Sequence, residues 1–281
     1  MRVLVLGAGG QLGGYLTPAA RAAGHEVHAR THAELDITDA GAVDTVIADL
    51  HPDVVVNAAA LTGVDASEGD PERAHAVNAV AVGSIGAAAA RVAAHVVHIS
   101  TDYVFDGTAH VPYRESDPTN PVNVYGRSKL AGEKALAASG CGWTVVRTSW
   151  VFGAPATDLP HWAITSFEAG TLTGVLADAE SVPTFAGDLS GTLLDVAVRR
   201  FAGVLHVVNG GSGTRHDLCV ASLAAVGLDG SSVPRIAADA LNRSARRPDY
   251  TVLDTTTMQE AGFTPLRHWR DALLAYLKGE T

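Results

Sequence analysis

The loop between the first apolar segment and the first helical segment is the feature that most constrains the fold of this chain. Residues Arg2–Leu6 form a short apolar run typical of a buried strand, and Gln11–Ala23 has a helical composition. Gly7, Gly10 and Gly13 punctuate the junction with G-x-x-G-x-x-G spacing. Glycines allow a tight turn and let backbone amides approach a phosphate at the positive end of a helix. The pattern alone is weak, but in this strand–turn–helix context it predicts a dinucleotide-binding site.

The segments that follow repeat the order of strand and helix. This alternation predicts an α/β fold, a Rossmann-type doubly wound parallel sheet with helices on both faces. We expect a dinucleotide-binding domain over residues 1–150 and a smaller substrate lobe over 151–281, some segments of which can return to the main sheet. Further strands are expected at Glu26–Ala29, Val54–Val56, Val96–Ile99 and Thr144–Arg147, and helices at Ala40–Leu50, Arg73–Ala94 and Val124–Ser139.

After Thr148 the alternation becomes irregular, and the pattern no longer dictates topology. Pro18 is expected to kink the first helix. Apolar pieces lie at Leu172–Leu176 and Val204–Val208, helical stretches at Leu189–Phe201 and His216–Ala225, and one packing face of a last helix is expected from Leu266, Trp269, Leu273, Leu274 and Leu277.

Charge and composition argue against several classes of protein. The net charge of −10 disfavours binding to nucleic acid or to an anionic membrane surface. The longest uncharged stretch, Ala74–Ala90, is shorter than the roughly 20 residues that span a bilayer, and the amino terminus has no signal peptide. Cys141 and Cys219 suit a reducing compartment, and the scattered histidines offer no metal-ligand spacing. We expect a cytoplasmic protein without a metal site.

The end of the second expected strand bears on the choice of dinucleotide. NAD-binding units usually carry an acid there, which holds the adenosine 2′-hydroxyl group. This chain has Arg30 followed by Thr31 and His32. A cation suits a 2′-phosphate, so the sequence favours NADPH, with NADH as the alternative if Arg30 is only a solvated surface residue.

A second group of residues indicates acid–base chemistry. Ser100 and Thr101 follow the fourth expected strand, and Tyr125 and Lys129 form Y-x-x-x-K on the next helix, where a spacing of four places them on one face. An ammonium group and an oxidised nicotinamide both favour tyrosinate, so Lys129 can tune Tyr125 while Thr101 holds a substrate oxygen. We expect the fourth strand to neighbour the first, which brings these residues to the crevice beside Gly7. The structural alternative is an ordinary amphipathic helix.

Seven motifs together make the chain similar to a known family. It resembles the extended short-chain dehydrogenase/reductases, and among them the dTDP-4-dehydrorhamnose reductase family, over nearly its whole length. The motifs are GAGGQLG at 7–13, LDITD at 35–39, VNAAA at 56–60, STDYVFDG at 100–107, NVYGRSKLAGE at 123–133, RTSWVFG at 147–153 and ARRP at 245–248.

The resemblance implies NADPH-dependent reduction of the C4 keto group of a nucleotide-linked 4-keto-6-deoxyhexose in deoxysugar biosynthesis. It makes Tyr125 the proton donor, Lys129 its partner and a ribose ligand, and Thr101 the group that orients the ketone. The cofactor contacts implied are Gly7, Gly10, Gln11, Leu12, Gly13, Arg30, Asp36, Ile37, Asn57, Ala58, Ala59, Ser100, Tyr125 and Lys129. The substrate contacts implied are Thr101, Asp102, Tyr103, Val104, Phe105, Trp150, Arg246 and Arg247.

Arg246 and Arg247 also stand out without the resemblance. They are adjacent cations in an acidic chain, and guanidinium groups match the oxygens of a substrate diphosphate. The competing interpretation is a salt bridge between lobes or a solvated loop.

The chain departs from the family pattern at several positions. Leu61, Ala66 and Ser67 replace polar residues common in the family after VNAAA, and few of the family's usual residues remain between 152 and 185 apart from Pro183 and Thr184. Tyr15 stands where some members have a glutamate linked to magnesium-dependent dimerisation. A homodimer is therefore left open.

Two other functions compete with reduction of the keto sugar. A sugar-nucleotide dehydratase or epimerase would retain its cofactor, but a dehydratase needs an acid pair after the threonine, whereas Tyr103 follows Asp102 here. A non-catalytic nucleotide-binding regulatory subunit could use the same scaffold, because a fold does not establish an activity. Stoichiometric consumption of NADPH with a keto-sugar nucleotide separates these functions.

Overall fold

A six-stranded parallel sheet forms the centre of the protein. The structure, a computed structural model, describes residues 1–154 and 157–279. The pairing of neighbouring strands is parallel throughout this sheet, which confirms the doubly wound α/β class. In spatial order the strands are β10 (Gly203–His206), β5 (Gly142–Thr148), β4 (His95–Thr101), β3 (Val54–Asn57), β1 (Arg2–Leu6) and β2 (Glu26–Arg30).

The order of the strands corrects one expectation from the sequence. β3 lies between β1 and β4, so the fourth strand does not neighbour the first. The physical reason is that residues 31–39 after β2 contribute no strand, and β3 pairs directly with the free side of β1, Leu6 opposite Asn57. The sheet therefore extends to one side of β1 with β2 and to the opposite side with β3, so the strand order reverses at β1. Ligands of open α/β sheets bind outside the carboxyl ends of the strands at such a reversal.

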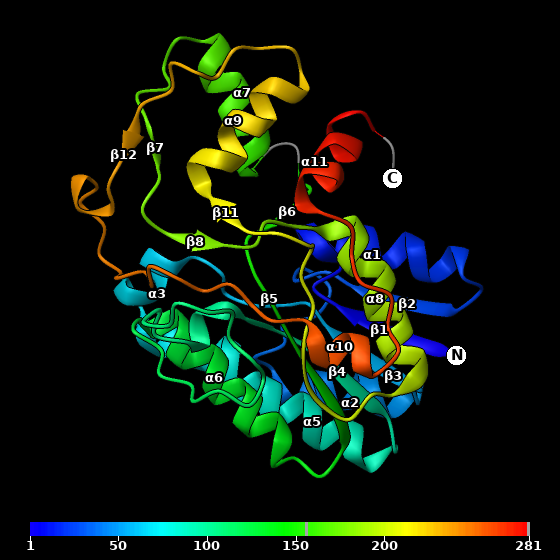
Figure 1. The fold of residues 1–281 in the computed structure, drawn as a ribbon. Coiled ribbons are helices and arrows are strands. Elements are labelled where there is room, and N and C mark those ends of the chain that lie inside the picture. The colour runs from blue at the N-terminus through cyan, green and yellow to red at the C-terminus, as the bar shows by residue number, and fades with distance from the viewer. Residues whose placement is uncertain (155–156, 280–281) are drawn as a thin grey trace.

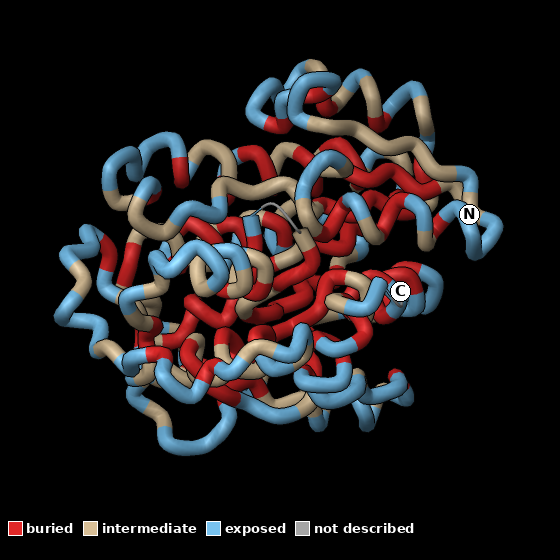
Figure 2. The backbone as a smooth tube through the Cα atoms, turned by 90° about the horizontal axis from the view of Figure 1, so that it is seen from above, coloured by how far each residue is buried: buried red, intermediate tan, exposed pale blue. Residues whose placement is uncertain are grey.

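Two helical layers cover the sheet (Figure 1). Buried residues gather in the middle of the molecule (Figure 2); β1, β3 and β4 are almost entirely buried, whereas β2 at the edge is exposed or half-buried along its length. Strand residues alternate between the two layers: Val3 and Val5 face one apolar cluster and Leu4 and Leu6 the other. The first layer contains α1 (Gln11–Ala22), α8 (Ala186–Arg199) and α10 (Thr256–Glu260), and the second contains α2 (Ala40–Leu50), α5 (Ala81–Arg91) and α6 (Val124–Ala137).

The helix expected at Arg73–Ala94 is interrupted by a π-helical turn. It consists of α4 (Pro71–His75), the turn η1 (Ala76–Val80) and α5, and it follows the short helix α3 (Val64–Gly69). Within η1 the buried side chain of Asn78 bonds both backbone groups of Leu61, at 2.9 and 3.0 Å. The turn therefore anchors the loop that follows β3.

Beyond residue 150 the chain builds a smaller lobe, in the upper part of Figure 1, and also returns to the main sheet. β10 forms an edge of that sheet, and α8 packs against α1. The domain boundary at 150 stays a prediction. The lobe contains α7 (Leu159–Glu168), α9 (Arg215–Ala225), α11 (Trp269–Leu277), the short helix η3 (Ala238–Ala240) and three strand pairs, β6 (Val151–Phe152) with β9 (Thr184–Phe185), β7 (Val175–Leu176) with β12 (Arg235–Ile236), and β8 (Glu180–Ser181) with β11 (Gly213–Thr214).

The expected face of the last helix is wrong in part. α11 begins at Trp269, so Leu266 precedes it, and Leu274 is 39% exposed. Residues at helical spacing from Trp269, namely Leu273 and Tyr276, form the buried face instead. Pro18 lies inside α1, which continues to Ala22. Among residues 1–154 and 157–279, no helix has the length and apolarity needed to cross a bilayer.

Candidate active site

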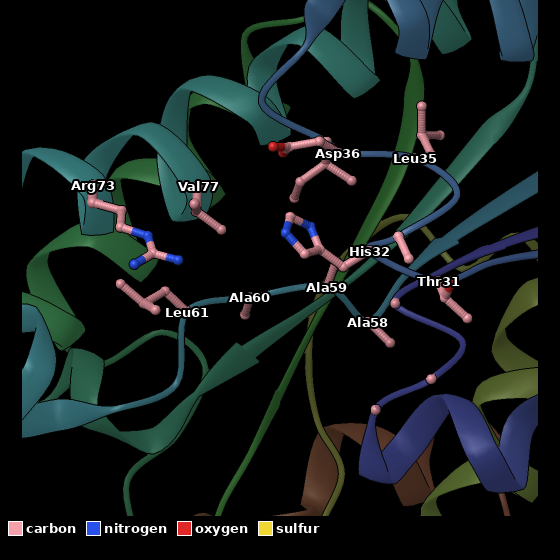
Figure 3. A pocket seen from close by; sticks show the side chains of 15 residues that line it. Thr31, His32, Leu35, Asp36, Ala58, Ala59, Ala60, Leu61, Arg73 and Val77 are labelled. Carbon is pink, nitrogen blue, oxygen red and sulfur yellow. The ribbon is translucent and has the colours of Figure 1, made fainter.

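A pocket of about 600 Å³ opens at the carboxyl ends of β1 and β3, where the strand order reverses (Figure 3). Its volume is within the range of small-molecule sites. The lining residues are Gly7, Gly9, Gly10, Thr31, His32, Ala33, Leu35, Asp36, Ile37, Ala58, Ala59, Ala60, Leu61, Arg73 and Val77.

The glycine loop requires glycine for steric reasons at two positions. Gly7 has a φ of +78°, and a Cβ there would lie 2.6 Å from the backbone nitrogen of Ala59. A Cβ on Gly13 would lie 2.3 Å from the carbonyl oxygen of Gly7. The loop therefore packs closely against α1 and against the segment after β3. Nε2 of Gln11, the first residue of α1, is a buried donor without a hydrogen-bond partner among the described residues.

The structure divides the expected cofactor contacts into two groups. One group lines the pocket and the other does not. Leu12 belongs to the second group, because its side chain packs into the apolar cluster between α1 and the sheet. Gly7, Gly10, Asp36, Ile37, Ala58 and Ala59 line the pocket, whereas Gln11, Leu12, Gly13, Arg30, Asn57, Ser100, Tyr125 and Lys129 are not among its lining residues.

The cations at the pocket differ from the one that the sequence suggested. Nη1 of Arg30 donates to the carbonyl oxygen of Ala29 at 3.0 Å. His32 and Arg73 instead extend into the pocket from opposite sides (Figure 3). The pKa of Asp36 is lowered mainly by hydrogen bonds from Thr38, and to a smaller extent by electrostatic interaction with His32 and Arg73. Sequence reasoning missed Arg73, because its helix meets the loop after β2 at the pocket only in the folded chain.

Thr101 and Tyr125 are brought together at the end of β4. Asn123 caps α6 by accepting a hydrogen bond from the backbone N–H of Gly126 at 2.8 Å, which fixes the start of the helix that carries Tyr125. Burial raises the pKa of Tyr125 above its ordinary value, and a hydrogen bond with Thr101 opposes this. The nearby Asp102 and Tyr103 raise the pKa further. This phenol is therefore held in its protonated form at neutral pH.

Lys129 is buried and turned toward β4. Its Nζ donates to the carbonyl oxygen of Ile99 at 2.6 Å and lies 3.2 Å from Nε2 of His98. Burial lowers the pKa of Lys129 to about 8, although the charge of Glu133 acts in the opposite direction. The amine and ammonium forms of this side chain are consequently close in free energy near neutral pH.

Ser100 belongs to an internal network. Its hydroxyl donates to Glu133 at 2.5 Å, and the guanidinium of Arg147 donates to both oxygens of the same carboxylate at 3.0 and 2.7 Å. All three side chains are buried. The network ties α6 to β4 and β5, and so it holds the helix that carries Tyr125 and Lys129.

Asp102 is another buried group, on the turn η2 (Asp102–Val104) that follows β4. It accepts hydrogen bonds from Thr101 at 3.0 Å, from Ser181 at 3.1 Å and from Thr251 at 2.5 Å. Burial raises its pKa to about 6 despite these bonds. Val104 and Phe105 pack in the apolar cluster beneath it.

Trp150 follows β5 with a backbone φ of +40°, which is uncommon for a bulky residue and marks local strain. The guanidinium carbon of Arg215 lies 4.4 Å from the centre of its ring. Arg215 also forms a hydrogen bond with Tyr103, whose pKa is raised by burial and lowered by this arginine. Trp150, Tyr103 and Arg215 thus form one group beside Tyr125, since the rings of Tyr103 and Tyr125 meet edge to face at 6.0 Å.

The adjacent arginines Arg246 and Arg247 are held separately. Arg247 donates to both oxygens of Asp65 at 3.2 and 2.6 Å and lowers the pKa of that carboxyl group to about 2. The side chain of Arg246 is exposed, and its carbonyl oxygen accepts from Asn123 at 2.9 Å. Arg243 is close enough to Arg247 and Arg215 for their charges to lower its pKa, after burial, which is the larger cause. Three arginines, Arg215, Arg243 and Arg247, therefore gather near Tyr103, and Asp65 forms an ion pair with one of them, Arg247.

Comparisons with known proteins agree with one another over this chain. A family model described as the RmlD substrate binding domain matches residues 1–281. The chain is 44% identical over 275 residues to the dTDP-4-dehydrorhamnose reductase of Mycolicibacterium smegmatis, covering 97% of this chain and 84% of that relative. It is 39% identical over 282 residues to the enzyme of the same name from Mycobacterium tuberculosis, covering 98% and 92%. The crystal structure of dTDP-4-dehydrorhamnose reductase from Bacillus anthracis in complex with NADP matches with a TM-score of 0.95 and 28% identity over 99% of each chain.

Proposed function

The chain belongs to the RmlD substrate binding domain family, and from this membership we infer that it is an NADPH-dependent reductase of a dTDP-linked 4-keto-6-deoxyhexose. The relatives named dTDP-4-dehydrorhamnose reductase point to dTDP-4-dehydrorhamnose as the substrate and to deoxysugar biosynthesis as the pathway. The observation that carries the proposal is the meeting of Thr101 and Tyr125 at the end of β4, with Lys129 one turn further along α6.

The residues around the pocket fit the cofactor. The glycine loop presents backbone amides at the start of α1, where Nε2 of Gln11 is a buried donor available to a ligand oxygen. Asp36, Ala58 and His32 line the same pocket, and Arg73 supplies a positive charge that suits a 2′-phosphate. When bound, NADPH supplies the hydride that reduces the ketone.

The acid–base groups suit reduction more than oxidation. Because burial, Asp102 and Tyr103 raise the pKa of Tyr125, its phenol carries a proton that it can donate to the developing alkoxide at C4. The Thr101 hydroxyl donates to Asp102 and accepts from the backbone N–H of Tyr103, which fixes it beside Tyr125. Rotation of its O–H from Asp102 to the substrate lets it donate to the ketone oxygen and orient it.

For the substrate diphosphate we propose Arg215 and Arg243, and we keep the adjacent pair Arg246 and Arg247, predicted from the sequence, as the alternative. The charge of Arg247 is already compensated by Asp65, whereas Arg215 stacks on Trp150 without an ion-pair partner among the described residues. Guanidinium groups of this kind bind phosphate oxygens in a bidentate manner.

The test is NADPH oxidation with a panel of dTDP-linked 4-keto-6-deoxyhexoses, with the new C4 stereocentre of the product assigned by NMR. We expect one NADPH consumed per sugar reduced, fastest with dTDP-4-dehydrorhamnose. A rearranged sugar without net NADPH consumption would indicate an epimerase or dehydratase. Binding of the nucleotide sugar without turnover would indicate a non-catalytic subunit.

Two further properties remain proposals. The unpaired thiols of Cys141 and Cys219 support a cytoplasmic location. A homodimer is the other. Tyr15 replaces the glutamate that some family members use for magnesium-dependent dimerisation, so we expect any dimer to be independent of Mg²⁺. Light scattering with and without Mg²⁺ tests this.

A further inference from the structure

A buried chain of hydrogen bonds runs from β3 to Lys129 through His98. The amide oxygen of Asn57 accepts the backbone N–H of Ala59 at 3.1 Å. The amide nitrogen of Asn57 lies 3.1 Å from Nδ1 of His98, and Nε2 of His98 lies 3.2 Å from Nζ of Lys129. The side chains of all three residues are buried.

The first contact determines the tautomer of the histidine. The N–H of Ala59 requires an acceptor, so Asn57 cannot present its NH₂ group to Ala59 and must present it to His98. Nδ1 of His98 is therefore an acceptor. Burial lowers the pKa of His98 well below its ordinary value, with the charge of Lys129 acting in the same direction, so the ring is neutral and carries its single proton on Nε2.

This tautomer has a consequence for Lys129. An N–H group of His98 points at Nζ, and only a neutral amine has the lone pair that accepts it, while one N–H of the amine remains bonded to Ile99. An ammonium group would place two donors against each other. Reversing the histidine tautomer to relieve this would break the bond from Asn57.

We propose that His98 is a positioning residue that selects the neutral amine of Lys129, with Asn57 holding the histidine in the required tautomer. His98 thereby keeps the two protonation states of the catalytic lysine close in free energy. Among the ionisable groups around the site, Glu133 from α6 acts on Lys129 directly, and Arg147 from β5 forms an ion pair with Glu133. Asp102 from η2 acts on Tyr125 of α6. Among these, Glu133 favours the ammonium form, so His98 opposes it.

The experiment measures Lys129 directly, because the chain contains only three lysines, Lys129, Lys134 and Lys278. With ¹³C-labelled lysine the three Cε signals are followed by NMR against pH in the free enzyme, and the signal missing from Lys129→Met is assigned to Lys129. We expect its midpoint near pH 8. In His98→Phe and in His98→Gln, whose side-chain oxygen can accept from an ammonium group, the midpoint rises by roughly 0.5 to 1 pH unit, the effect of one neutral hydrogen bond.

His95→Gln is the matched control, since His95 is a buried histidine on the same strand whose ring bonds Thr144 at 2.8 Å. It leaves the midpoint of Lys129 unchanged. Unchanged or lowered midpoints in folded His98 variants, or an equal shift in the control, overturn the proposal. A kinetic measurement rests on the proposed function: the alkaline limb of the kcat profile moves up in the His98 variants. The NMR titration needs no substrate, so failure of the reductase assignment leaves it intact.

Discussion

At the scale of single residues, Tyr125 has the clearest chemical role. Its phenol is kept protonated by burial and by Asp102, beside a hydroxyl that can orient a ketone. Tyr125→Phe keeps the ring but removes the proton, so we expect kcat to fall at least about a hundredfold while the Kd for NADPH stays within about twofold. Steady-state kinetics and a fluorescence titration with NADPH check this. Turnover within a few fold of the parent enzyme would remove Tyr125 from the role of proton donor.

Arg73 and Arg30 make different predictions for the choice of cofactor. Arg73 lines the pocket, whereas Arg30 is bonded to its neighbour's carbonyl group. A charge-assisted bond to the 2′-phosphate contributes roughly 1.5 to 3 kcal/mol, so Arg73→Ala should weaken NADPH about tenfold or more and leave NADH nearly unchanged. Arg30→Ala is the matched control and should change neither affinity. If only Arg30→Ala discriminates between the cofactors, the interpretation made from the sequence is correct.

Arg215 is expected to bind the substrate. It lies over Trp150 and bonds Tyr103, so it reaches the group beside Tyr125, and its loss should raise the KM for the keto-sugar nucleotide about tenfold while the KM for NADPH stays constant. Arg247→Ala should instead lower the Tm, because it removes the ion-pair partner of Asp65. Kinetics and thermal denaturation of both variants check this. The opposite pattern would return diphosphate binding to Arg247.

At the scale of elements, the π-helical turn η1 connects the helical layer with the pocket. Asn78 satisfies both backbone groups of Leu61, a residue that lines the pocket, and also donates to Ser128. Asn78→Ala leaves these groups unpaired at a cost of about 1–3 kcal/mol each if they stay buried, and it frees the loop after β3. We expect a lower Tm and a raised KM for NADPH.

Ser128→Ala is the control, because it removes only one of the three contacts of Asn78. It should lower the Tm less and leave the KM for NADPH unchanged. Equal cofactor constants in the parent and in Asn78→Ala would show that the turn supports the helix without shaping the pocket.

The elements also show what could be predicted from the sequence. Apolar runs such as Val54–Asn57 and helical stretches such as Ala40–Leu50 were predicted because their pattern is local. The order of the strands was not, because it depends on residues 31–39 forming no strand. The motifs similarly identified Thr101 and Tyr125. They did not identify the ion pair of Arg247, the contact of His98 with Lys129 or the place of Arg73 in the pocket, because these are tertiary contacts that no local spacing encodes.

At the scale of the whole molecule, three residues of the sheet region form polar contacts with the later part of the chain close to the site. Asp102 binds Ser181 and Thr251, Asp65 binds Arg247, and Asn123 binds the carbonyl group of Arg246. Each contact begins within or beside an element that carries a candidate site residue. Separation of the two parts would therefore disturb the site as well as the interface. Because Asp102 is an ionisable member of this interface, the stability of the interface should depend on the ionisation of Asp102.

The sign of that dependence follows from the raised pKa of Asp102, about 6 in the folded protein against an ordinary value of 3.8. The folded state holds this proton more strongly than the unfolded chain, so the contribution to stability is complete below about pH 4 and is lost as the pH rises through about 6. A shift of about two pKa units corresponds to about 3 kcal/mol. Asp102→Asn cannot ionise, so its Tm should rise relative to the parent between pH 4.5 and 7.5, whatever its absolute value. Thermal denaturation of both proteins in matched buffers measures this difference in Tm. The other carboxyl groups titrate in both proteins, so their effect cancels in the difference. A difference in Tm that is constant with pH would mean that Asp102 does not link protonation to the joining of the two parts.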